Sequence, residues 1–282
     1  MVTRPALWTA ALLVALAGCS KKKGDDAPKD SAKSTEPTTD PTASGGTATD
    51  PPAEGTPVRI AGAANLVKVM EEIVPRFEKQ SGAKVDFIPG SSGKLAAQLE
   101  EGAPFDLFLA ANVKFVDQAT SSGECLAASK KLYARGHIVM WSKEGARDEP
   151  PAKLDGLVDE KYETIALAQP DQAPYGAAAK AALEKLGVWS KIEKRVVYGT
   201  NIEDTMKLAE SGNAEVALLA LSQVIKGKGK YVEVPDELHD PLDQALAVCK
   251  NGKQQALAGK FVEFLATPEI QELMKTYGYT IP

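Results

Sequence analysis

Small polar residues follow a predicted strand at residues 89–95, where the sequence reads PGSSGKL. The apolar run VDFI precedes this stretch, and the helix-like LAAQLEEG follows it. The first turn of such a helix presents free peptide N–H groups and the positive end of the helix dipole. A strand that ends in this way therefore indicates an anion-binding turn, with Lys94 as its obvious cationic ligand.

Three more turns of this kind precede predicted helices, at residues 64–65, 174–175 and 201–202. If the four turns face one another, their helix N-termini converge on one point and hold an anion without any protein cation. Taken separately, each turn has a plainer interpretation: the polar residues cap helices and the aromatic lies on the surface. The sequence does not decide whether the turns converge.

Other kinds of chemistry find little support. PGSSGKL lacks the spacing of a P-loop, and its serines do not form a Gly-x-Ser-x-Gly elbow. Only two histidines occur among 282 residues, His137 and His239, which argues against a multi-histidine metal or catalytic site. The formal net charge of −5 disfavours nucleic acid as a partner. We therefore expect no enzyme activity and no resident metal cation.

The N-terminal region has the pattern of an exported protein. Residues 1–18 form a short apolar segment with one early charge, of signal-peptide proportions, and Leu-Ala-Gly-Cys ends it. This ending resembles a bacterial lipobox, which predicts that Cys19 carries lipid; the alternative is an ordinary secretory peptide. Residues 19–57 then form a polar segment that we expect to be a disordered tether. The predicted location is the periplasm, with a lipid anchor in a membrane.

The remaining sequence alternates strand and helix patterns. An apolar stripe follows Asn65, which stands at a helix N-cap position, and Pro75 should bend or break that helix. Strands are predicted at residues 58–61, 84–88, 106–110, 133–141, 164–168, 215–219 and 242–250. Helices are predicted at residues 95–101, 112–121, 176–186, 202–210, 254–265 and 268–277.

This order predicts an α/β fold of parallel β-α-β units. A second set nested inside the first indicates two lobes joined by two crossing strands, with a ligand cleft between them. We place lobe I at residues 58–135 and 236–282, and lobe II at residues 136–235. Cys125 and Cys249 both fall within lobe I and are free to pair in an oxidising compartment, but we expect them on different parts of the fold, which disfavours a disulfide.

Four stretches carry a resemblance to a known family: IAGAANLVKVMEEIVPRFEKQSGAKV, PGSSGKLAAQLEEGAPFDLFLAA, APYGAAAKAALEKLGVW and the terminal YGYTIP. They resemble the periplasmic molybdate-binding proteins of ABC importers, over residues 58–282. The resemblance implies a class II periplasmic-binding-protein fold, a monomer and a partnership with ABC permease subunits. It also implies that a tetrahedral oxyanion is held by backbone N–H groups and neutral side chains, with no cofactor and with metal present only within the oxyanion.

Carried over by position, the resemblance implies a set of oxyanion-binding residues: Ala64, Asn65, Ser92, Tyr175 and Ile202. Two positions depart from one branch of the family, because Asn65 replaces a serine and Ala220 replaces a binding tyrosine. Asn65 and Tyr175 together resemble the other branch. Lys94 then becomes a cation at a helix start that does not touch the anion.

Neutral donors suit an oxyanion that carries no proton. Phosphate keeps a proton near neutral pH and needs an acceptor carboxylate, which none of the matched positions supplies. Sulfate is separated from molybdate and tungstate only by cavity size. The sequence thus predicts an extracytoplasmic solute-binding protein for molybdate or tungstate, with another oxyanion such as sulfate as the alternative. An enzyme or sensor on a two-lobed scaffold is a third hypothesis, disfavoured by the lack of an acid–base residue in the matched set.

Overall fold

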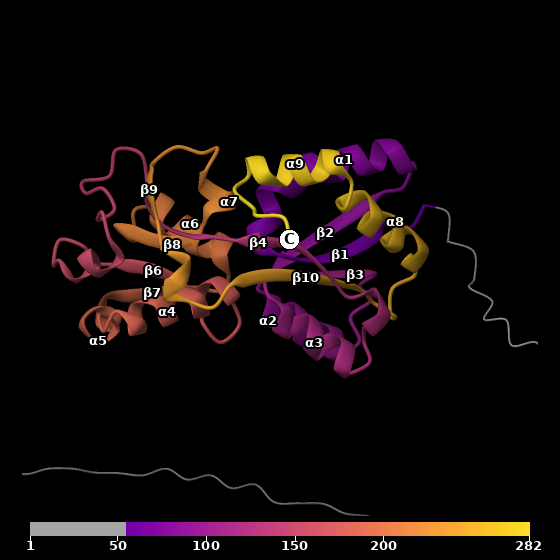
Figure 1. Cartoon of the computed structure of the whole chain (residues 1–282), viewed down its shortest axis with the longest axis horizontal. Coiled ribbons are helices and arrows are strands. Elements are labelled where there is room, and N and C mark those ends of the chain that lie inside the picture. Colours follow the sequence, from indigo (N-terminus) through magenta and orange to yellow (C-terminus); the bar gives the residue numbers. More distant parts are fainter. Residues whose placement is uncertain (1–54) are drawn as a thin grey trace, which may run out of the picture. The chain divides into compact units, whose positions relative to one another are not determined.

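The computed structural model describes residues 55–282, which form two mixed β-sheets flanked by helices (Figure 1). The predicted signal peptide (1–18), the predicted lipidation site Cys19 and nearly all of the predicted tether (19–57) lie outside the described residues. Among residues 55–282, no helix has the length and apolar character needed to cross a membrane.

We call the first sheet and its helices lobe I. Its strand order is β2-β1-β3-β10-β4, with β1 parallel to β2 and β3, and β10 antiparallel to β3 and β4. Its strands are β1 Val58–Ala63, β2 Val85–Gly90, β3 Leu107–Ala110, β4 Lys131–Gly136 and β10 Leu242–Val248. Its helices are η1 Ala64–Leu66, α1 Val67–Ser81, α2 Ser92–Glu100, α3 Val113–Ser121, η2 Ala127–Ser129, α8 Gln255–Leu265 and α9 Pro268–Thr276.

Both faces of this sheet are buried at its middle strand, β3, which is therefore apolar without a break. Leu107 and Leu109 of β3 face a core that includes residues of α1, α8 and α9. Phe108 and Ala110 face a second core with α2 and α3. Figure 1 shows these two groups of helices on opposite sides of the strands. Because successive side chains of a strand point to opposite faces of the sheet, β3 contributes to both cores.

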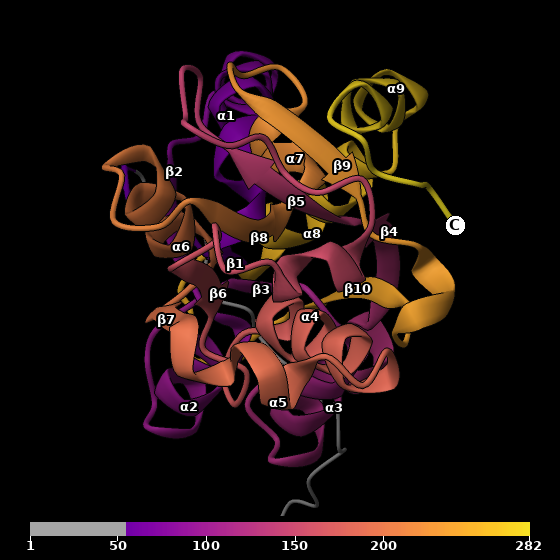
Figure 2. The ribbon, with the colours of Figure 1, turned by 90° about the vertical axis from the view of Figure 1, so that its left-hand side faces the viewer.

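We call the second sheet and its helices lobe II. Its strand order is β7-β6-β8-β5-β9, with β6 parallel to β7 and β8, and β5 antiparallel to β8 and β9. The strands are β5 Ile138–Ser142, β6 Ile165–Ala168, β7 Val196–Gly199, β8 Val216–Ala220 and β9 Lys230–Glu233. The helices are η3 Leu154–Val158, α4 Pro174–Lys185, α5 Trp189–Ile192, η4 Glu193–Arg195, α6 Ile202–Glu210 and α7 Leu221–Val224. Figure 2 looks onto this lobe, where α4 and α6 pack against the strands.

The chain passes between the two sheets twice. The strand predicted at residues 133–141 is in fact two strands: β4 ends at Gly136 and β5 begins at Ile138, in different sheets. His137 lies at this break and contacts Asp236 Oδ1 at 3.1 Å and Thr280 Oγ1 at 2.9 Å. The return passage runs from β9 to β10 and contains η5 Asp236–Leu238. The predicted two-lobed arrangement with two crossing segments is therefore present.

One local prediction about the first helix is wrong, and the break considered at Pro75 does not occur. Asn65 caps no helix, because it lies within η1 and α1 begins after Leu66 without a side-chain cap. Pro75 does not interrupt α1, which continues to Ser81. Pro75 is exposed on the solvent side of the helix, where a missing peptide donor leaves no buried acceptor unsatisfied.

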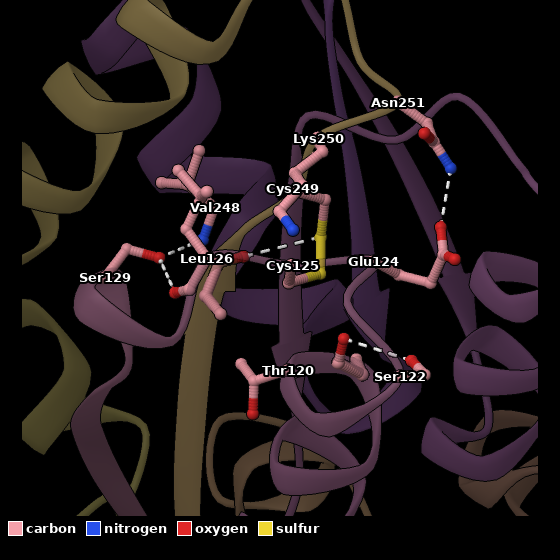
Figure 3. Close-up of a disulfide and its surroundings, with 12 residues drawn as sticks. Thr120, Ser122, Glu124, Cys125, Leu126, Ser129, Val248, Cys249, Lys250 and Asn251 are labelled. Carbon is pink, nitrogen blue, oxygen red and sulfur yellow. Dashed lines mark hydrogen bonds between the residues drawn. A yellow bond between two sulfur atoms is a disulfide. The ribbon is translucent and has the colours of Figure 1, made fainter.

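The expectation against a disulfide is also wrong, because Cys125 and Cys249 are bonded (Figure 3). The segment after α3 runs antiparallel to the end of β10, so the two cysteines face each other in an isolated bridge. Flanking hydrogen bonds of 2.8 Å join Leu126 N to Val248 O and Lys250 N to Glu124 O. Both cysteines belong to the same core of lobe I, although 124 residues separate them in sequence.

Candidate functional site

The four predicted turns meet at one small cavity with a volume of about 10 Å³. Its walls come from the end of β1 with η1, the start of α2, the start of α4 and the start of α6. The lining residues are Ala63, Ala64, Asn65, Gly90, Ser91, Ser92, Ala111, Ala173, Pro174, Tyr175 and Ile202. All five residues of the predicted oxyanion-binding set lie on this cavity. Lys94 is exposed and is not part of the lining.

Free peptide donors surround the cavity. Ala64, Asn65, Ser92, Tyr175 and Ile202 all stand in the first turn of a helix, where the N–H group has no intrahelical acceptor. None of these five N–H groups donates a hydrogen bond to another residue among 55–282. The cavity is thus bordered by the positive ends of several backbone dipoles.

The start of α6 shows how one N–H group is kept free. Asn201 is the N-cap, and its Oδ1 accepts the N–H groups of Glu203 and Asp204, each at 2.9 Å. The cap therefore satisfies the second and third peptides of the helix and leaves the first, Ile202. Asn201, which the sequence shows only as part of a turn, thus determines that the N–H of Ile202 is the one left free.

Ser92 is fully buried at the start of α2. Its Oγ accepts the N–H of Ala111 at 2.9 Å, which fixes the direction of the hydroxyl. Because the oxygen already acts as an acceptor in that bond, its proton remains available as a donor. The neighbouring Ser91 also lines the cavity, and its buried Oγ has no partner among the described residues.

Tyr175 enters from α4 and is 3% exposed. Its hydroxyl oxygen accepts the Nε2–H of Gln244 at 3.1 Å. Burial, with a smaller contribution from Tyr279, raises the pKa of the Tyr175 phenol well above its usual value. The group therefore stays neutral and keeps a proton that it can donate.

Asn65 enters from η1 and is 1% exposed. Its Nδ2 donates to Gln244 Oε1 at 3.1 Å and to the Tyr279 hydroxyl at 2.9 Å, while its Oδ1 has no partner in the described part of the chain. The peptide oxygen of Asn65 accepts from Tyr279 at 3.0 Å and from Ser222 Oγ at 2.9 Å. Four hydrogen bonds thus fix this residue beside the cavity.

No lining residue carries a formal charge, so any attraction for an anion comes from dipoles and hydrogen bonds. Close packing positions these groups. A Cβ atom on Gly176 would lie 2.0 Å from Ala168 O, so α4 approaches β6 more closely than a larger residue allows. This approach sets the position of the neighbouring Tyr175.

The two lobes touch around the cavity. Gly93 N of α2 donates to Gln172 O of lobe II at 2.9 Å, and Ser222 of α7 donates to Asn65 of lobe I. Further out, Lys226 Nζ lies 3.3 Å from Glu72 Oε1. The described arrangement is therefore a closed one, in which donors from both lobes face the same space.

Sequence reasoning missed the residues behind the cavity. Gln244 lies in β10, Tyr133 in β4 and Tyr279 near the C-terminus, and all three are buried. In the sequence they appear only as members of the predicted strands at residues 133–141 and 242–250 and of the terminal YGYTIP. Neither pattern indicates which lining side chain each residue contacts.

Comparison with known proteins identifies the family. The sequence model of the bacterial extracellular solute-binding proteins matches residues 58–280. The chain belongs to this family. It is accordingly a solute-binding protein of an ABC importer and not an enzyme, as the sequence predicted.

Individual relatives agree with this assignment. The molybdate-binding protein ModA of Rhodobacter capsulatus is 36% identical over 229 residues, which are 81% of this chain and 90% of that relative. The solved periplasmic molybdate-binding protein of Azotobacter vinelandii matches with a TM-score of 0.75 at 29% identity, over 80% of this chain and 99% of that one. The sulfate-binding protein SubI of Mycobacterium tuberculosis H37Rv matches with a TM-score of 0.69 at 14% identity, over 80% of this chain and 87% of that one, which shows a common fold only. The predicted two-lobed binding-protein fold and the resemblance to the periplasmic molybdate-binding proteins are confirmed.

Proposed function

We propose that this protein captures molybdate or tungstate outside the cytoplasm and delivers it to the permease of an ABC importer. The observation that carries the proposal is the neutral cavity bordered by five free peptide N–H groups and by the side chains of Asn65, Ser92 and Tyr175. Two molybdate-binding relatives, at 36% and 29% identity, support the same choice of solute.

The number of donors is sufficient for tight binding. A hydrogen bond to a charged group contributes roughly 1.5–3 kcal/mol net. Five to seven such bonds, after the costs of desolvation and of ordering the two lobes, correspond to roughly micromolar to nanomolar affinity. Binding of this strength does not require a cationic side chain.

The size and chemistry of the cavity limit the solute. A cavity of about 10 Å³, with room for roughly one water-sized group, suits a small inorganic ion better than a drug-sized organic molecule, whose pockets occupy roughly 300–1,000 Å³. The lining contains no carboxylate that could accept a proton from hydrogen phosphate. These features favour an oxyanion without a proton.

Isothermal titration calorimetry with molybdate, tungstate, sulfate and phosphate tests the proposal. We expect micromolar or tighter binding of molybdate and tungstate, sulfate binding at least about 100-fold weaker, and no heat with phosphate. Tight sulfate binding with no response to molybdate would overturn the assignment in favour of the alternative oxyanion.

The anchor, the partner and the lobe boundaries are proposals that rest on the sequence. We infer that Cys19 carries the lipid, that residues 19–57 tether the binding domain, and that the protein meets its permease as a monomer. We also keep the boundaries at residues 58–135 with 236–282 and at residues 136–235. Expression of a Cys19→Ser variant should move the protein from the membrane fraction to the soluble extracytoplasmic fraction; continued membrane association would contradict the anchor.

A further inference from the structure

We propose that Gln244 is a positioning residue that aims the hydroxyl proton of Tyr175 into the cavity. The inference rests on the proposed function, because it assigns a role within the oxyanion site. Gln244 does not line the cavity and is fully buried in β10. Its effect on a bound anion therefore acts through the side chains that it contacts.

The Gln244 amide makes three hydrogen bonds, and the Tyr133 hydroxyl that contacts it also lies 3.3 Å from Ala110 O. Its Oε1 accepts from Asn65 Nδ2 at 3.1 Å and from the Tyr133 hydroxyl at 2.9 Å. Its Nε2 donates to the Tyr175 hydroxyl oxygen at 3.1 Å. With two donors directed at Oε1, the amide has only its N–H group left for Tyr175.

This direction decides where the Tyr175 proton goes. A phenol has one proton, and Tyr175 uses its oxygen to accept from Gln244. Among residues 55–282 the Tyr175 hydroxyl donates to no other group, and Tyr175 lines the cavity. If the amide were reversed, Tyr175 would donate to Gln244 and its proton would leave the cavity. The same amide holds Asn65, so one side chain orders two of the cavity groups.

The contact also joins the lobes. Gln244 belongs to the sheet of lobe I, whereas Tyr175 belongs to α4 of lobe II. Gly136 leaves the space for their meeting, because a Cβ atom there would lie 1.9 Å from the Tyr175 hydroxyl and 2.6 Å from Gln244 Nε2. Because the bond crosses between the lobes, the Tyr175 donor is oriented only where they come together. Gln244 thus contributes to affinity when the cleft closes.

A double-mutant cycle tests this role with molybdate as the probe. The cycle compares Gln244→Met, Tyr175→Phe and the double variant in titration calorimetry. We expect Gln244→Met to weaken molybdate binding about 30-fold in the otherwise unchanged protein, but no more than about 5-fold when Tyr175→Phe is already present. The residual effect would act through Asn65. A space-filling role alone predicts that the two effects multiply, and this outcome would overturn the inference.

Controls separate positioning from general damage. Gln223→Met removes another buried glutamine amide, which lies outside the cavity lining, and it should change molybdate affinity less than about 3-fold. Thermal unfolding checks that each variant is folded. If Gln244→Met does not fold, Gln244→Asn replaces it in the cycle, because the shorter amide should not reach Tyr175 while keeping a polar group in the core.

The failure of the inference is distinguishable from failure of the proposed function. If the unaltered protein binds neither molybdate nor tungstate, the proposed function is wrong and the inference falls with it. If the unaltered protein binds molybdate and the two substitutions are independent, the function stands and only the role of Gln244 is wrong.

Discussion

Replacing Ser92 with alanine separates the two roles of its hydroxyl. The Oγ accepts the buried N–H of Ala111 at 2.9 Å, and its proton is free to donate to an anion. Loss of one hydrogen bond to a charged group costs roughly 1.5–3 kcal/mol, which corresponds to about 10- to 150-fold weaker binding. Loss of the acceptor for Ala111 should also lower the anion-free stability by about 1–3 kcal/mol.

Calorimetry with molybdate measures the first effect, and chemical denaturation without anion measures the second. Lys94→Ala is the matched control, since Lys94 is in the same turn but is exposed and does not line the cavity. We expect Lys94→Ala to change affinity less than about 3-fold, as for a screened surface charge. The reasoning is refuted if Lys94→Ala weakens binding more than Ser92→Ala does, or if Ser92→Ala leaves affinity unchanged.

Three further predictions follow from packing, charge and covalent structure. Gly136→Ala should displace the Tyr175 hydroxyl, weakening molybdate binding about 10-fold and lowering the free energy of unfolding by about 1–3 kcal/mol. An unchanged molybdate affinity in calorimetry would contradict the close approach of Tyr175 to Gly136. Hydrogen bonding from Tyr277 and the ion pair with Lys226 lower the pKa of Glu72, so its stabilisation is present above the usual carboxyl range and is lost as pH falls through the lowered value. Glu72→Gln should therefore lower the melting temperature at pH 7 by an amount equivalent to less than about 1 kcal/mol, since the side chain is 39% exposed. The difference should shrink as the pH falls through the lowered pKa of Glu72, and a difference that grows on acidification would argue against this account. Reducing the disulfide of lobe I, which joins residues 124 apart, should lower the free energy of unfolding by about 3–5 kcal/mol in denaturant titrations and leave molybdate affinity unchanged. A loss of affinity would indicate that the disulfide supports the cavity.

Local sequence patterns were enough to predict the four turns. Three of the turns follow predicted apolar strands and all four precede predicted helices, and a helix start exposes N–H groups whatever its residues are. The ligand set, by contrast, came from the resemblance to a family. The convergence of the turns on one cavity required the structure, because it depends on how two sheets are placed.

The features that could not be predicted from the sequence depend on pairing between segments far apart in the chain. Most of the stretch 133–141 is apolar, and nothing in it shows that Gly136 ends one sheet and Ile138 begins another. The disulfide depends on the segment after α3 running beside the end of β10, which no local pattern encodes. The role proposed for Gln244 likewise depends on strand register, since only the register of β10 places it beside Asn65 and Tyr175.

A cavity bordered by peptide N–H groups has an unusual mutational profile. Most substitutions at positions such as Ala64 or Ile202 change the side chain and leave the donor in place, so drift at these positions should be tolerated if size is respected. Proline is the exception, since it alone removes the N–H group. The same property suits protein engineering: helix starts of this kind, brought together on another α/β scaffold, would carry an anion site whose recognition depends on backbone geometry more than on residue identity.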